Sequence, residues 1–156
     1  MILLLSTSDT DLLSARSSGA DYRLANPNRV THDELAEMAD AADVVVVRVL
    51  GGYRYFEEGL DLLRARATPL VCLGGEMAPD AEMMELSSVP AGVAAEAHTY
   101  LAQGGTENLA QLHAFLSDTV LLTGEGFAPP VELPEWGELS LPDTEVDGPT
   151  VAVLFY

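Results

Sequence analysis

Three hydroxyl side chains follow the first apolar run of the chain, where a loop leads into an amphipathic segment. Ser6, Thr7 and Ser8 come directly after Met1–Leu5 and precede Asp9. Backbone N–H groups at the start of a helix can hold a phosphate, as flavin mononucleotide sites do. Asp9 disfavours an anion there, and ordinary N-capping by a hydroxyl also explains these residue types. The loop is therefore a candidate ligand site for which capping is the simpler interpretation.

Two glycine pairs follow later apolar runs and could let the backbone pass close to a ligand. Gly51-Gly52 comes shortly after Arg48, and Gly74-Gly75 precedes Glu76. Tight turns from strand to helix also need glycine, so each pair has a purely structural explanation. Arg48 ends an apolar run and could clamp an anion or pair with a carboxylate such as Glu76. Pairing is the favoured interpretation, because a buried charge needs a partner.

The sequence predicts neither a metal site nor a catalytic residue. His98 and His113 fall on neighbouring predicted helices and could meet around a metal, but fifteen residues and a helix break separate them. That spacing specifies no metal geometry. Cys72 is the sole cysteine, which excludes an intrachain disulfide and a cysteine-cluster metal site. No arrangement of serine, cysteine and histidine indicates nucleophilic catalysis.

Several phosphate and cofactor motifs are absent from the sequence. The chain has no lysine, which excludes a Walker phosphate loop and a phospho-acceptor receiver domain. No Gly-x-Gly-x-x-Gly follows an apolar run, and the Asp-x-His-x-x-Gly signature of cobalamin-binding domains is missing. These absences exclude the common nucleotide-binding and phosphotransfer classes.

Apolar runs alternate with amphipathic segments, a pattern typical of βαβ units on a parallel sheet. Strands are predicted over residues 1–6, 22–25, 43–48 and 68–73. Helices are predicted over 8–19, from 31, through 56–63, and over 79–86, 91–103 and 106–122. The four valines of Val44–Val47 leave no polar face, which places their strand centrally. We therefore expect an α/β fold with an open, mostly parallel, flavodoxin-like sheet of order 2-1-3-4 and a helical C-terminal layer. In such a sheet, ligands favour the loops after the first and third strands.

The composition changes after residues 1–123, which form the predicted α/β domain. Residues 124–149 contain five prolines, four glycines, seven carboxylates and no basic residue, which is typical of an acidic, proline-rich linker. Phe127 and Trp136 are its expected anchors. Thr150–Tyr156 is β-branched, apolar and aromatic, so we expect residues 150–156 to form the first strand of a truncated following domain. The natural polypeptide is then expected to continue beyond Tyr156.

The formal charge of −18 is unevenly distributed. Residues 1–66 hold all 7 basic residues and 11 acidic ones, and the later residues add 14 acidic ones. Such a field repels nucleic acid and anionic lipid, so we expect neither as a partner. Met1–Leu5 is too short for a signal peptide or a membrane span. A cytoplasmic protein is expected, in agreement with the single cysteine.

Several short blocks resemble the N-terminal region of the CobN-type large subunit of aerobic cobaltochelatase, a relative of the large subunit of magnesium chelatase. They are Met1–Asp11, Val46–Gly52, Leu73–Glu76, Val89–Leu101, Gly104-Gly105, Asn108-Leu109 and Leu112–Leu116. The resemblance covers nearly the whole chain. It depends on the order and composition of these blocks and includes no catalytic signature.

The resemblance implies a part of a ligase-class, ATP-dependent enzyme that inserts cobalt into the corrin hydrogenobyrinic acid a,c-diamide during cobalamin biosynthesis. It implies partners: the remainder of the same chain, and two ATPase-motor-type subunits through which cobalt insertion uses ATP and magnesium. Corrin and metal chemistry is expected mainly on later domains, and no cofactor is expected in this region. Because the substrate carries carboxylates, the acidic surface favours a structural or docking domain without activity alone. Two alternatives remain open, an independent flavodoxin-like module for a small ligand and an acidic protein-interaction domain.

Overall fold

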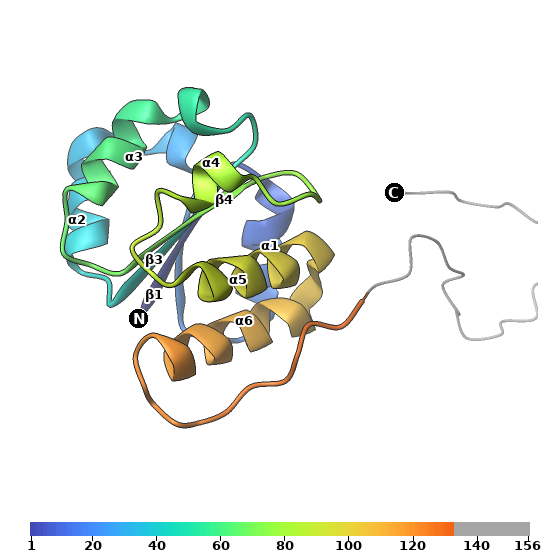
Figure 1. Cartoon of the computed structure of the whole chain (residues 1–156). Coiled ribbons are helices and arrows are strands. Elements are labelled where there is room, and N and C mark those ends of the chain that lie inside the picture. The colour runs from blue at the N-terminus through green and yellow to red at the C-terminus, as the bar shows by residue number, and fades with distance from the viewer. Residues whose placement is uncertain (133–156) are drawn as a thin grey trace, which may run out of the picture.

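Four parallel strands form one sheet at the centre of the molecule (Figure 1). The computed structural model describes residues 1–132, and the predicted anchor Trp136 and strand 150–156 lie outside them. The strands are β1 (Ile2–Ser6), β2 (Tyr22–Ala25), β3 (Val44–Val49) and β4 (Leu70–Gly74), in the order β2-β1-β3-β4. The predicted α/β class and strand order are confirmed.

The register aligns the carboxyl ends of the strands at one edge. Ser6 of β1 lies opposite Arg48 of β3, which in turn lies opposite Leu73 of β4. Every residue of β1, β3 and β4 is buried, as expected for parallel strands that are covered on both faces. Polar side chains at this edge are therefore brought together by the pairing itself.

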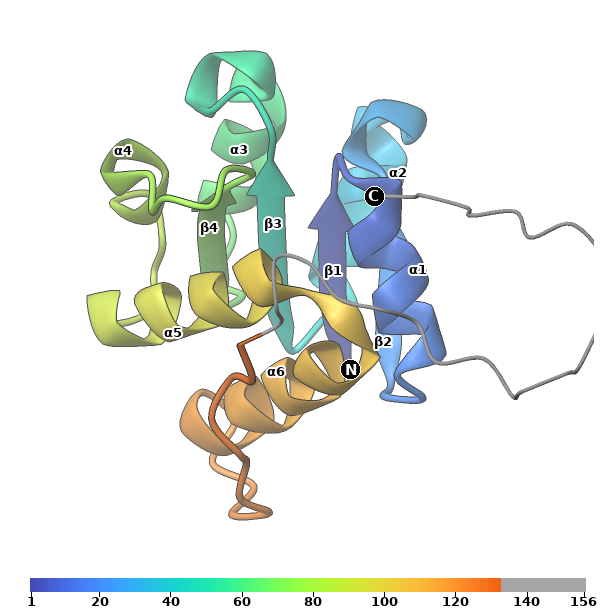
Figure 2. The same ribbon diagram turned by 90° about the vertical axis from the view of Figure 1, so that its right-hand side faces the viewer.

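Helices cover both faces of the sheet: Figure 1 shows α2 and α3 on one side of the strands and α5 and α6 on the other, and Figure 2 shows the sheet nearly face-on with α5 and α6 in front. They are α1 (Asp9–Ser17), α2 (His32–Asp40), α3 (Glu57–Arg64), α4 (Ala81–Met84), α5 (Ala91–Gln103) and α6 (Gly105–Thr119). One apolar core joins Ile2, Leu4 and their neighbours to α1, α5 and α6. The other joins Leu3, Leu5 and their neighbours to α2, α3 and α4. None of the helices within residues 1–132 is both long and apolar enough to cross a lipid bilayer.

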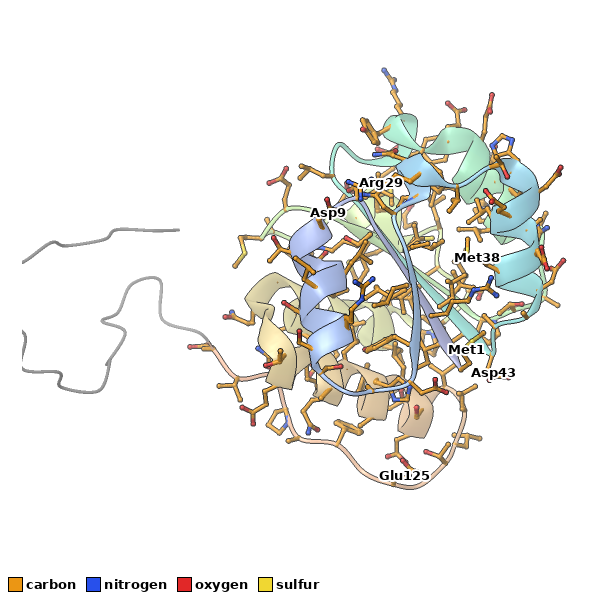
Figure 3. The ribbon with its side chains drawn as sticks, turned by 180° about the vertical axis from the view of Figure 1, so that it is seen from behind. Met1, Asp9, Arg29, Met38, Asp43 and Glu125 are labelled. Carbon is orange, nitrogen blue, oxygen red and sulfur yellow. The ribbon has the colours of Figure 1, made fainter. Side chains whose placement is uncertain are left out.

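Local sequence signals account for the helix starts. The Ser8 hydroxyl caps α1, and Thr31 forms a capping box with Glu34 at the start of α2, the helix predicted from residue 31. Two short 3-10 helices, Pro27–Arg29 and Tyr53–Tyr55, were not predicted. Ion pairs tie loops at the two ends of the sheet: Arg29 lies against Asp9, and the amino terminus of Met1 against Asp43 (Figure 3).

The outer edge of β4 is closed by two serines. Leu70 donates its backbone N–H to Ser88 Oγ at 2.8 Å, and Cys72 donates its own to Ser87 Oγ at 2.9 Å. The backbone N–H of Ser88 donates in turn to the carbonyl of Leu70 at 2.9 Å. These bonds satisfy groups that a neighbouring strand would otherwise pair.

Residues 124–132, the first part of the predicted linker, form an extended strap along α5 and α6. Phe127 packs edge-on against Phe115 at 5.0 Å, so the predicted anchoring by Phe127 is confirmed. Asn108 binds Val131 twice, through Nδ2 to its carbonyl at 2.9 Å and through Oδ1 from its N–H at 2.8 Å. The Tyr100 hydroxyl donates to the carbonyl of Ala128. The strap is therefore attached to α5 and α6 through Phe127, Ala128 and Val131.

Candidate functional site

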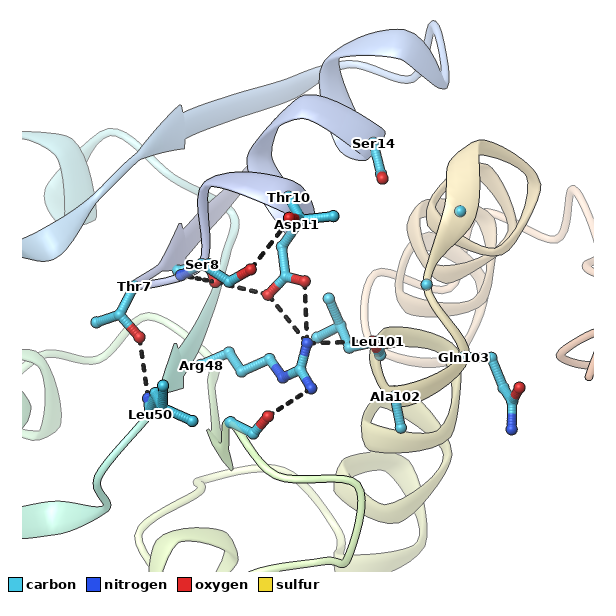
Figure 4. A pocket seen from close by; sticks show the side chains of 14 residues that line it. Thr7, Ser8, Thr10, Asp11, Ser14, Arg48, Leu50, Leu101, Ala102 and Gln103 are labelled. Carbon is cyan, nitrogen blue, oxygen red and sulfur yellow. Dashed lines mark hydrogen bonds and ion pairs between the residues drawn. The ribbon is translucent and has the colours of Figure 1, made fainter. Parts of the chain in front are cut away.

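A cleft of about 550 Å³ lies at the carboxyl edge of the sheet, between the start of α1 and the turn from α5 to α6 (Figure 4). Four predicted site residues line it: Ser6, Thr7, Arg48 and Gly75. Parallel pairing delivers the first three to this edge, because β1 and β3 are neighbours. The cleft is where the strand order predicts a ligand.

Arg48 forms a buried ion pair with Asp11. Its Nη1 lies 2.9 Å from Asp11 Oδ1 and 3.0 Å from Oδ2, and the two side chains are only 9% and 8% exposed. Ser6 Oγ donates to Asp11 Oδ2 at 2.6 Å. The predicted pairing of Arg48 is confirmed, but the suggested partner Glu76 is wrong. Asp11 is buried in the first turn of α1, and from there its carboxylate contacts the Arg48 guanidinium directly.

Three backbone carbonyls complete the surroundings of the guanidinium. Nη1 also donates to Leu101 at 3.1 Å, Nη2 to Gly75 at 2.8 Å and Nε to Gly74 at 3.4 Å. The side chain thus joins β3 to α1, α5 and the end of β4. This is the pattern of a structural cross-link, since its charge is matched and each of its three nitrogens donates to the protein.

The hydroxyls of the loop after β1 are engaged in local hydrogen bonds. Ser8 donates its N–H to Ser6 Oγ at 3.0 Å, and Asp11 donates its N–H to Ser8 Oγ at 3.4 Å. Thr7 Oγ1 accepts from the N–H of Leu50 at 2.9 Å, which ties the loops after β1 and β3 together. Capping and loop closure account for all three hydroxyls.

The remaining predicted residues line a second hollow, of about 390 Å³, beside the first. Gly51, Gly52, Gly74, Gly75 and Glu76 lie there with Arg54, Asp80 and Glu82. Gly75 lines both hollows, so the structure gathers every predicted loop candidate at one edge.

Steric constraints explain why each of these four positions is occupied by glycine. Gly51 and Gly52 have φ of +98° and +72°, which side chains disfavour. A Cβ on Gly74 would lie 2.7 Å from Asp80 Cβ, and one on Gly75 would lie 2.7 Å from Leu50 Cα. The structural explanation of the glycine pairs is therefore sufficient.

The two histidines have separate surroundings. Nε2 of buried His98 lies 3.1 Å from the carbonyl of Glu76, whereas His113 meets the Tyr22 ring edge-on at 5.0 Å. Within residues 1–132, no three histidine, cysteine or carboxylate side chains are placed to hold a metal ion. His98 and His113 therefore contact different parts of the fold.

The pKa values of Cys72 and Asp9 are shifted, the first by burial and the second by hydrogen bonds. Burial raises the pKa of the Cys72 thiol to about 12, and no reactive thiolate is available there near neutral pH. Hydrogen bonds from Arg29 and Asn26 hold the pKa of Asp9 below its usual value. Asp9 is thus fixed as a carboxylate at the rim of the loop.

Sequence reasoning missed the central role of Asp11. The sequence gives no local sign that Asp11 pairs with Arg48, because the bond spans 37 residues. Strand order places Arg48 beside β1, so the register of β1 with β3 was the signal that could have found the pair.

Comparisons with known proteins agree in sequence and in structure. No family model matches the chain. The aerobic cobaltochelatase subunit CobN of Sinorhizobium sp is 33% identical over 122 residues, covering 69% of this chain and 10% of that protein. The solved catalytic subunit of cobaltochelatase from Mycobacterium tuberculosis is 55% identical, with a TM-score of 0.87, covering 95% of this chain and 13% of that one.

The chain spans about a tenth of the length of the curated relative that it matches. The match to the solved structure extends over nearly all of the chain. The predicted resemblance is confirmed, and the chain is therefore related to the CobN-type catalytic subunit of cobaltochelatase, of which it corresponds to a small part.

Proposed function

We propose that this chain is one domain of a cobaltochelatase large subunit that inserts cobalt into hydrogenobyrinic acid a,c-diamide in cobalamin biosynthesis. One observation carries the proposal: 55% identity over 95% of the chain to the catalytic subunit from Mycobacterium tuberculosis. Cobalt is here a substrate. In this proposal the reaction is ATP-dependent and of the ligase class, and two ATPase-motor-type subunits supply the energy to the large subunit.

Within that enzyme, the domain acts as a structural or docking module and not as the corrin site. The guanidinium at the cleft is neutralised by Asp11 and occupied by carbonyl oxygens, so it offers little to a carboxylate of the substrate. All 14 charged residues after Arg66 are acidic. Their field repels an anionic corrin.

The enzyme activity is tested with the full-length subunit, the two ATPase-type subunits, Co²⁺, ATP and the corrin diamide. We expect cobalt insertion, followed by the change in corrin absorbance, only when all components are present. Omission of ATP is the control for energy dependence. Cobalt insertion without ATP would contradict the ligase assignment, and no insertion in the complete mixture would contradict the proposed activity.

The role of the domain is tested by calorimetric titration of the 156-residue chain with the corrin diamide. We expect no saturable binding, because the charges of like sign repel. Titration of the full-length subunit is the positive control. Tight, stoichiometric binding by the chain alone would assign the substrate site to this domain.

The cleft favours one second candidate, an independent module for a small ligand. Its volume of about 550 Å³ is in the range of small-molecule sites. Under this alternative, the purified chain carries a nucleotide or a yellow flavin, which absorbance and mass spectrometry of the denatured extract detect. A ligand-free extract favours the chelatase domain.

A further inference from the structure

Three large apolar side chains are exposed at the carboxyl edge of the sheet. Leu50 is 55% exposed, Tyr55 57% and Met77 66%, and they come from the loops after β3 and β4. We call these three residues the edge patch. Single exposed apolar residues are ordinary on a protein surface, whereas a group at one edge marks an interaction site.

The edge patch is held together by close backbone contacts. A Cβ on Gly75 would lie 2.7 Å from Leu50 Cα, so the Met77 loop runs directly against Leu50. A Cβ on Gly51 would lie 3.4 Å from Tyr55 Cβ, which places Tyr55 against the residue that follows Leu50. Thr7 and Asn28 fix the other sides through bonds to the Leu50 N–H and the Tyr55 hydroxyl. The patch is thus preorganised, which lowers the entropy lost on docking.

The strap returns the chain to this same edge. From the end of α6 it runs back along the helix, and at Val131 it binds Asn108, near the start of α6. Asn108 also donates to the carbonyl of Gly104 at 2.8 Å. Gly104 and Leu50 both line the first cleft. The polypeptide after residue 132 therefore begins close to the cleft that borders the edge patch.

We propose that the edge patch is the docking surface for a further domain of the same subunit. The inference deepens the proposed function and rests on it, because it takes the chain as one domain of a longer polypeptide. The solved relative supplies the length, since this chain covers only 13% of it. Three carboxylates, Glu76, Asp80 and Glu82, line the hollow next to the patch against one cation, Arg54, so the charge of this lining is net negative. The docking surface of the partner domain is therefore apolar at its centre and basic on the side that meets these carboxylates.

Methionine oxidation tests the docking directly. Met77 is exposed and Met83, on α4, is fully buried, so the two form an exposed and a buried probe six residues apart. With dilute peroxide, we expect Met77 to oxidise at least about tenfold faster than Met83 in the 156-residue chain. In the full-length subunit, we expect the rate at Met77 to fall by about tenfold because the partner domain excludes the oxidant. Peptide mass spectrometry follows both residues.

Equal rates at Met77 in the chain and in the full-length subunit would overturn the docking. A pair of variants of the full-length subunit gives a second measurement. Leu50→Asp places a charge in the patch and should restore rapid oxidation of Met77, whereas Leu13→Asp, at an exposed apolar position of α1 outside the patch, should leave Met77 protected. Protection that survives Leu50→Asp would also count against the proposal.

The experiments distinguish failure of the docking proposal from failure of the proposed enzyme activity. Cobalt insertion by a full-length subunit whose Met77 remains reactive would reject the docking surface and leave the enzyme activity in place. Protection of Met77 in a subunit that inserts no cobalt would keep the docking surface and reject the activity.

Discussion

Arg48 is a charge removed from water and matched by one carboxylate. Burying two ions is costly, so such a pair adds little net stability compared with apolar residues of the same shape. Removing only one partner is different, because the other ion is left buried and unpaired. A substitution of Arg48 or Asp11 alone should therefore destabilise the protein more than replacement of both residues by apolar ones.

Arg48→Met should lower the free energy of unfolding by about 3–5 kcal/mol, because Asp11 would remain buried without its cation. Urea unfolding measures the loss. The exposed pair of Arg29 with Asp9 gives the control, and Arg29→Met should cause a much smaller change. The double variant Arg48→Met with Asp11→Leu should recover much of the stability. Equal losses for Arg48→Met and Arg29→Met would show that the buried pair has no special weight.

Cys72 should resist thiol reagents while the protein is folded. Its pKa is raised from 9.0 to about 12 by burial, so the folded thiol keeps its proton where an unfolded one loses it. The unfolded state then binds fewer protons above about pH 9, and the Cys72 contribution to stability falls as the pH rises towards 12. Labelling with a chromogenic disulfide at pH 9 should be slow in buffer and fast in urea. Rapid labelling of the folded chain would contradict the burial.

At the scale of elements, two glycines predict opposite outcomes for the same substitution. Gly75→Ala should destabilise the protein, by about 1–3 kcal/mol, because the new methyl group meets the Leu50 backbone at 2.7 Å. Gly92→Ala, in the first turn of α5 with no atom within 4 Å, should stabilise it by about 0.5–1 kcal/mol. Thermal and urea unfolding of both variants measure the difference. A neutral Gly75→Ala would mean that the loops after β3 and β4 are not in contact.

The end of the strap at Val131 is held by one amide side chain, Asn108. Asn108→Ala removes both hydrogen bonds to Val131, so the amide of Val131 should exchange with deuterium much faster. Gln111→Ala is the matched control on the same helix, because it removes only the bond from the N–H of Ala128. Exchange at Val131 should stay slow in that variant. Unchanged exchange in Asn108→Ala would show that Phe127, Tyr100 and Gln111 hold the strap without this amide.

At the scale of the whole molecule, the charge of −18 opposes compaction. We expect the melting temperature to rise when NaCl is increased from about 20 mM to about 500 mM, because salt screens the repulsion between carboxylates. Calorimetry at a single pH measures this. A melting temperature that falls with salt would mean that favourable ion pairs outweigh the repulsion.

The sequence was sufficient for the sheet but not for the contacts that bind its loops. Four valines placed β3 centrally, and the capping residues Ser8 and Thr31 located two helix starts, because these signals are local. The Asp11 partner of Arg48 and the bonds of Asn108 and Tyr100 to the strap were missed, because each joins segments that are distant in sequence. The proline and acidic residues of 124–132 indicate only the local preference of this segment for an extended conformation. Their attachment depends on Asn108 and Tyr100, which give no sign of it in the sequence.

The serines beside β4 give the sheet a closed side and an open side. Ser87 and Ser88 already occupy the backbone groups of Leu70 and Cys72 that a fifth strand would need. At the opposite margin, β2 is bonded to β1 alone among the strands of residues 1–132. A strand that joins this sheet beside β4, from later polypeptide or from a second molecule, would therefore first have to displace both serines.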